Sequence, residues 1–139
     1  MRQMTFAMFV LVLGVSACGS DSNERVLGQW VNPRGAKVEF NADHVANLRQ
    51  EGLLEAEPWN WRFADTAYVV YKDTALDGKA SFRTEMVFTL RDTTLTLTAF
   101  IRSTEGKVTR VDGEKFAEMS RWSPADLVFT RVPVNKGRE

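Results

Sequence analysis

Hydrophobic and polar side chains alternate with a period of two along much of the chain. The clearest run is the segment 82–91, in which Phe82, Met86 and Phe88 share one face and mainly polar residues, among them Arg83 and Glu85, occupy the other. Alternation of this kind is typical of a β-strand that is buried on one face and solvated on the other. The segment 95–102 repeats the pattern, so the two segments predict an amphipathic β-hairpin.

In the second strand of this hairpin, Leu95, Leu97 and Ile101 are expected to face inward. Phe100 is expected on the outward face, where a large aromatic side chain needs a cover or a partner. A cover formed by the segment around Phe116 is one explanation, and a partner-binding patch is the other.

Turn sequences separate further strand-like segments. Asp-Thr pairs at 65–66 and 92–93 and the hairpin signal Asp77-Gly78 are typical of tight turns. The other expected strands are 26–31, 36–40, 44–50, 59–63, 68–71, 107–111 and 127–132. About eight short strands predict an all-β, antiparallel up-and-down meander, and closure into a small barrel would hide its edges most completely.

Residues 107–121 allow two interpretations. Asp112-Gly113 would support a second hairpin, whereas the residues that follow are largely helix formers, with Phe116 and Met119 three apart. We favour a short helix near 113–121 over the hairpin by a narrow margin.

The N-terminal segment follows a different pattern. Arg2 precedes an apolar run from Met4 to Val15, as in an export signal. Those residues would span only about 18 Å as a helix, against roughly 30 Å for a bilayer's hydrocarbon core, so a transmembrane anchor is disfavoured. Cleavage as an ordinary secretion signal and retention as an N-terminal helix are the alternatives to the interpretation that follows.

The residues Val15-Ser16-Ala17-Cys18 resemble a bacterial lipobox at every position. The resemblance implies that residues 1–17 are a lipoprotein signal peptide. It also implies that the Cys18 sulfur receives a diacylglyceryl group, and that its amine usually receives a further fatty acyl chain such as palmitate. Two or more acyl chains anchor a protein stably, so the membrane is an expected partner through Cys18.

The residue after the cysteine bears on location. In Gram-negative lipoproteins an Asp there commonly retains the protein in the inner membrane. Gly19 therefore implies the cell outer membrane, with the protein on its periplasmic face, and inner-membrane anchoring is less favoured.

Domain boundaries follow from these patterns. We expect a lipidated cysteine and short polar tether at 18–25, a barrel domain at 26–133 and a polar tail at 134–139. Cys18 is the only cysteine, so an intrachain disulfide is excluded. Lys and Arg number 18 and Asp and Glu also number 18, and this balance gives no electrostatic reason to expect a nucleic-acid partner.

Two short motifs near the ends of the predicted domain resemble those of lipocalin-like (calycin-type) barrels. They are Gly28-Gln29-Trp30 in the first strand and Arg131 in the last. The resemblance implies that the Trp30 indole crosses the closed end of a barrel and that Arg131 lies on it. Gly28 would give the backbone room to bend there, and the three residues would have a structural role.

Residues suited to catalysis are sparse. His44 is the only histidine and has no second His or free Cys to help it bind a metal. Glu55 and Glu57 fall in a polar loop, and solvated carboxylates of this kind need burial or a like-charged neighbour to act as acids. We expect no catalytic residue, no metal site and no cofactor, and we predict that the protein is not an enzyme.

Three function classes remain open. The first is a binding module for a small apolar or lipid-like ligand. Its candidate wall residues, assigned from their predicted inward faces, are Trp59, Trp61, Phe82, Met86, Phe88 and Leu97. Core packing is the default for the two tryptophans. The second class is a protein-interaction module, such as an envelope assembly accessory or an inhibitor. The third, an enzyme, is the least favoured.

Overall fold

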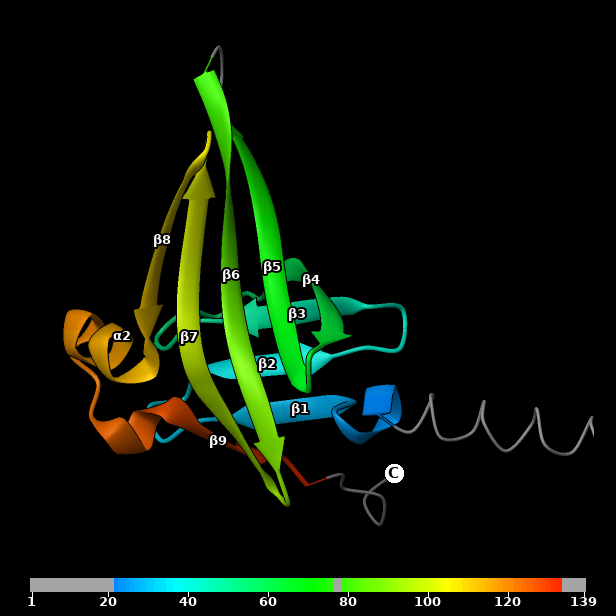
Figure 1. The fold of residues 1–139 in the computed structure, drawn as a ribbon. Coiled ribbons are helices and arrows are strands. Elements are labelled where there is room, and N and C mark those ends of the chain that lie inside the picture. Colours follow the sequence, from blue (N-terminus) through cyan, green and yellow to red (C-terminus); the bar gives the residue numbers. More distant parts are fainter. Residues whose placement is uncertain (1–21, 77–78, 134–139) are drawn as a thin grey trace, which may run out of the picture.

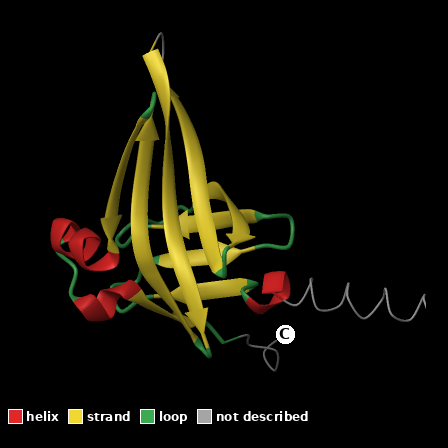
Figure 2. Ribbon diagram, in the orientation of Figure 1, coloured by secondary structure: helices red, strands yellow, loops and turns green. Residues whose placement is uncertain are grey.

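The computed structural model describes residues 22–76 and 79–133, and it confirms the all-β prediction (Figure 1). The strands are β1 (Gly28–Val31), β2 (Lys37–Phe40), β3 (Val45–Arg49), β4 (Glu57–Ala64), β5 (Ala67–Leu76), β6 (Lys79–Arg91), β7 (Thr94–Thr104), β8 (Lys107–Asp112) and β9 (Val128–Arg131). The helix α2 (Gly113–Ser120) and the 3-10 helix η1 (Pro124–Leu127) lie between β8 and β9, as the helical elements in Figure 2 show.

Eight of the strands form a closed antiparallel barrel. Strands β1 to β7 pair with their neighbours in chain order, and β9 pairs with both β7 and β1. The ring closes in this way without leaving an edge between its first and last strands. Strand β8 lies outside the ring and pairs with the upper part of β7.

The strands of the barrel differ greatly in length. β1 and β2 have 4 residues each, whereas β5, β6 and β7 have 10, 13 and 11. Figure 1 shows β5, β6 and β7 rising well beyond the short strands that cross behind them. One end of the barrel is therefore compact, and the other opens beneath a tall curved sheet.

Strand β4 makes this opening by changing partners along its length. Its residues Glu57–Asn60 pair with β3, and its residues Asn60–Ala64 pair with β5. The last β4–β5 pair on the open side is Asn60 with Tyr71. Above that pair the two strands diverge.

The prediction that Phe100 faces outward is wrong. The β6–β7 register shifts between Val87 and Phe88, because Val87 pairs with Ala99 and Phe88 with Leu97. Thr98 is therefore an extra residue, and a bulge of this kind reverses the faces of the residues beyond it. Leu97 faces the interior before the bulge, and Phe100 lines the interior after it.

The predicted helix is confirmed over Gly113–Ser120. Asp112 caps it by accepting a hydrogen bond from the Lys115 backbone N–H at 2.8 Å. A Cβ on Gly113 would lie 2.6 Å from the Leu97 carbonyl oxygen. Glycine at this position therefore lets α2 sit directly against β7.

Aromatic side chains fill the compact half of the barrel. Phe40 lies at their centre, with ring centroids 5.5 Å from Trp61, 6.2 Å from Tyr68 and 6.3 Å from Phe88. The three contacts are edge-to-face, a favourable arrangement for aromatic pairs. This half is a packed core with its large side chains interlocked.

The chain enters the barrel beside this core. Residues 22–25, the end of the predicted tether, are helical, and the Tyr68 hydroxyl donates to the Ser22 carbonyl. Val26, expected in the first strand, is fully buried and precedes β1. The predicted signal peptide, lipobox and acylated Cys18, the predicted turn at 77–78 and the predicted polar tail lie outside the described residues.

Candidate functional site

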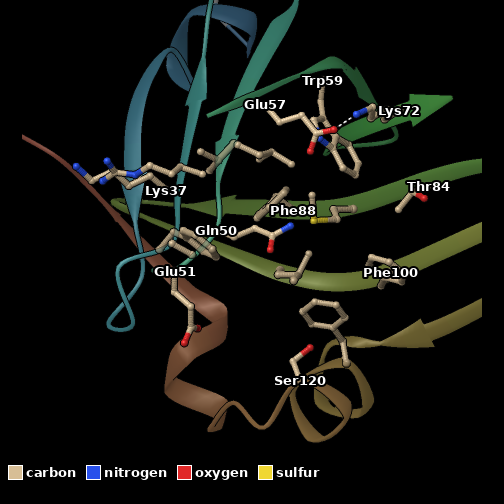
Figure 3. A pocket seen from close by; sticks show the side chains of 18 of the residues that line it. Lys37, Gln50, Glu51, Glu57, Trp59, Lys72, Thr84, Phe88, Phe100 and Ser120 are labelled. Atoms are coloured by element: carbon tan, nitrogen blue, oxygen red, sulfur yellow. Dashed lines mark ion pairs between the residues drawn. The ribbon is translucent and has the colours of Figure 1, made fainter. Parts of the chain in front are cut away.

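A pocket of about 560 Å³ lies at the open end of the barrel, a size within the roughly 300–1,000 Å³ typical of small-molecule sites. It is enclosed by the tall sheet on one side, by the short strands on another and by α2 on a third, at the bottom of the view in Figure 3. Its apolar lining consists of Ala36, Val38, Leu48, Trp59, Phe82, Met86, Phe88, Leu97, Phe100, Phe116, Trp122 and Phe129.

Five of the six wall residues predicted from the sequence line this pocket. They are Trp59, Phe82, Met86, Phe88 and Leu97. Phe88 and Leu97 are 2% exposed and form its floor against the packed core. Trp59 and Phe82 lie nearer to the opening, on β4 and β6.

Trp61 does not line the pocket, so its prediction as a wall residue is wrong. It is only 1% exposed, and its Nε1 donates to the Asn41 carbonyl at 2.9 Å. It shares a strand face with Trp59 but lies two residues, about 6–7 Å, further along β4. That step takes Trp61 out of the pocket and into the core cluster around Phe40.

A row of three aromatic rings supplies wall residues that the sequence did not reveal. Phe100 stacks on Phe116 of α2 at 5.0 Å, and Phe116 meets Trp122 edge-on at 5.6 Å. The predicted cover of Phe100 by the Phe116 segment therefore exists, but on the pocket side of the sheet. The only signal in the sequence was the apolar spacing of the helix.

The rim of the pocket is charged. Lys72 of β5 and Glu57 of β4 form an ion pair across the place where the two strands diverge (Figure 3). Arg102 lies 4.9 Å from the Phe82 ring centroid, a cation–π contact at the upper wall.

On the opposite side of the rim, Glu51 is held by two neighbours. Arg34 makes two hydrogen bonds of 2.7 Å to its carboxylate, and the Trp122 Nε1 donates to it at 3.2 Å. The Arg34 hydrogen bonds lower the pKa of the Glu51 carboxyl from its ordinary value. Glu51 therefore joins Arg34 to Trp122 at the rim, and both of its carboxylate oxygens accept hydrogen bonds within the protein.

One polar atom in the pocket wall has no partner. The Nε1 of Trp59 is buried and makes no hydrogen bond within the described part of the chain. Buried N–H donors are nearly always satisfied in native proteins. This donor therefore lacks an acceptor in a residue that lines the pocket.

The closed end of the barrel has the arrangement implied by the lipocalin-like resemblance. The Arg131 guanidinium lies 4.4 Å from the Trp30 ring centroid and donates to the carbonyls of Leu27 and Arg25. Gly28 has a φ of 115°, and a Cβ there would lie 2.9 Å from the Arg131 Nη1. Glycine is thus needed both for the backbone conformation and for the approach of the guanidinium.

The only histidine has a packing role in the structure. His44 lies in the turn before β3 with a φ of 67°, and its ring stacks on Trp61 at 4.6 Å. Among residues 22–76 and 79–133, no cluster of three or more His, Cys, Asp or Glu side chains is placed to hold a metal ion. In the same ranges, no helix has the length and apolar character needed to cross a membrane.

The chain matches no protein-family model, no curated protein and no solved structure in comparisons with each. The structure by itself defines a small closed β-barrel with a stacked Arg–Trp pair at one end and an aromatic pocket at the other. This architecture is compatible with a lipocalin-like barrel.

Proposed function

We propose that this protein is a lipid-anchored envelope protein whose barrel binds a small apolar or lipid-like ligand. The observation that supports it most strongly is the pocket of about 560 Å³ with its aromatic and methionine lining. Concave, mostly apolar pockets with a few polar groups are the usual form of small-molecule sites. Closure of the barrel around such a volume separates this molecule from barrels that are filled entirely by their own side chains.

The anchor in this proposal is the acylated Cys18, and the location is the periplasmic face of the outer membrane. The lipobox and Gly19 support both. Residues 22–25 pack against the compact end of the barrel, next to Tyr68. The pocket lies at the other end of β1 to β3, beside Lys37 and Gln50. The pocket therefore opens on the side of the barrel opposite the chain entry.

Ligand binding is tested by native mass spectrometry. The mature chain 18–139 with Cys18→Ser, purified without detergent, is expected to show a population heavier by the mass of a small organic molecule. The variant Met86→Trp, which fills the pocket with an indole, is expected to lose that population while remaining folded. A spectrum with only the mass of the bare chain would contradict the proposal.

The anchor is tested on the full-length chain in its bacterial host. Cys18→Ser is expected to move the protein from the membrane fraction to the soluble periplasmic fraction and to abolish incorporation of labelled palmitate, because no sulfur remains to be acylated. Ser20→Ala, which leaves the cysteine intact, serves as the control. Labelled, membrane-bound Cys18→Ser protein would refute the lipobox interpretation.

A second candidate is a protein-interaction module, favoured by the exposed strand β8. Among the described residues β8 pairs only with β7, and Val108 in it is 65% exposed. An unpaired strand edge can accept a strand from another chain. An empty barrel in the mass spectrum, together with crosslinks from β8 to one specific envelope protein, would favour this function over ligand binding.

A further inference from the structure

The four tryptophans of the chain differ in one respect that concerns the pocket. The indole N–H groups of Trp30, Trp61 and Trp122 each donate a hydrogen bond within the protein, at 2.9, 2.9 and 3.2 Å. The N–H of Trp59 is also buried, but it has no acceptor among the described residues. The indole with the unpaired N–H therefore belongs to a residue that lines a cavity large enough for a ligand.

The surroundings of Trp59 form one of the polar parts of the pocket. Figure 3 shows its indole beside the Glu57–Lys72 ion pair. Lys72 is 35% exposed and Glu57 is 48% exposed, so water and a ligand can both reach the pair. A head group placed here meets one N–H donor and one ammonium group, while a chain attached to it meets the apolar wall.

The charges that line the pocket favour an anion over a cation. Four cations line the pocket, Lys37, Arg49, Lys72 and Arg102, and Glu57 is the carboxylate paired with Lys72. The other lining carboxylate, Glu51, is already held by Arg34 and a tryptophan N–H. An anionic ligand oxygen would replace Glu57 as the partner of Lys72, whereas a cationic head would have to displace Lys72 itself.

We infer, on the basis of the proposed function, that the ligand is an apolar chain ending in a carboxylate. One carboxylate oxygen accepts from the Trp59 Nε1 and the other pairs with the Lys72 ammonium. The chain lies along Phe82, Met86 and Phe88. A single N–H and a single ammonium supply one partner for each oxygen of a carboxylate, whereas the further oxygens of a phosphate group would rely on water.

The test is isothermal titration calorimetry of the mature Cys18→Ser chain with dodecanoate and with dodecyltrimethylammonium. These probes share a chain and differ in head group. Trp59→Phe keeps an aromatic ring and removes the N–H, so dodecanoate binding is expected to weaken about tenfold. Binding of the ammonium probe, which has no acceptor, should not change. Trp61→Phe is the matched control, because its indole lies outside the pocket and its N–H already donates to the Asn41 carbonyl.

A second variant tests the site without altering the apolar wall of the pocket. Glu57→Gln releases Lys72 from its intramolecular partner, so dodecanoate should bind about threefold more tightly. Equal dodecanoate affinities for the starting chain, Trp59→Phe and Glu57→Gln would overturn the inference and leave the proposed function standing. Failure of the starting chain to bind either probe would overturn both.

Discussion

Replacing Trp30 by alanine is expected to destabilise the barrel by about 3–5 kcal/mol, the usual range for removing a large aromatic side chain from a core. Trp30 is 1% exposed, and its Nε1 donates to the Val26 carbonyl at 2.9 Å. The substitution would leave a cavity at the closed end, an unpaired buried carbonyl and an Arg131 guanidinium without its ring. Equilibrium urea denaturation measures the loss.

Two further variants separate the loss of the apolar ring from the loss of the N–H. Trp30→Phe preserves much of the apolar volume but removes the N–H, and it is expected to cost clearly less than the alanine substitution. Leu54→Ala is the neutral reference, because that side chain is 92% exposed and its loss should stay within about 0.5 kcal/mol. If Trp30→Ala lost no more than Leu54→Ala, the closing role of Trp30 would be wrong.

Replacing Asn32 by alanine is expected to cost about 2–4 kcal/mol, because several buried backbone groups depend on this one side chain. Asn32 is 4% exposed. Its Oδ1 accepts from the backbone N–H groups of Arg34 at 3.1 Å and Ala36 at 2.9 Å, and its Nδ2 donates to the Asp126 carbonyl at 2.9 Å. The amide therefore joins the β1–β2 turn to η1, which precedes the last strand.

The matched control for this prediction is Asn47→Ala. Asn47 lies on β3 and is only partly buried, and removing its amide should change the free energy of unfolding by about 0.5 kcal/mol or less. Thermal unfolding followed by circular dichroism compares the two variants. Similar losses in both would show that Asn32 does not join the turn to η1 in the way described.

Local pattern predicted the strand faces well wherever the pairing stayed regular. Phe82, Met86 and Phe88 were placed correctly because alternation continues without interruption along their part of β6. Phe100 was misplaced because the extra residue at Thr98 depends on how β7 pairs with β6, and alternation within one strand carries no information about its partner's register.

The position of a side chain along the barrel axis could not be predicted from the sequence, for a related reason. Trp59 and Trp61 share one face of their strand. A period of two predicts which face a side chain occupies, but it does not predict how far along the barrel axis the side chain lies. Trp59 reaches the pocket because β4 leaves β5 above Asn60, whereas Trp61 lies below that point in the core. The role of Asn32 could not be predicted from the sequence either, since its bond to Asp126 joins positions 94 residues apart.

The sequence by itself determined the all-β class, favoured a short helix after β8 over a hairpin and, through a family resemblance, indicated the residues at one end of the barrel. The first two follow from local periodicity and from helix-forming residues within a few consecutive positions, and the third from two short motifs near the ends of the domain. Only the tertiary structure decided that the other end holds a pocket, that α2 supplies part of its wall and that the Trp59 N–H is unpaired there. A cavity is the space left between elements of unequal length, and it exists only once distant strands have paired.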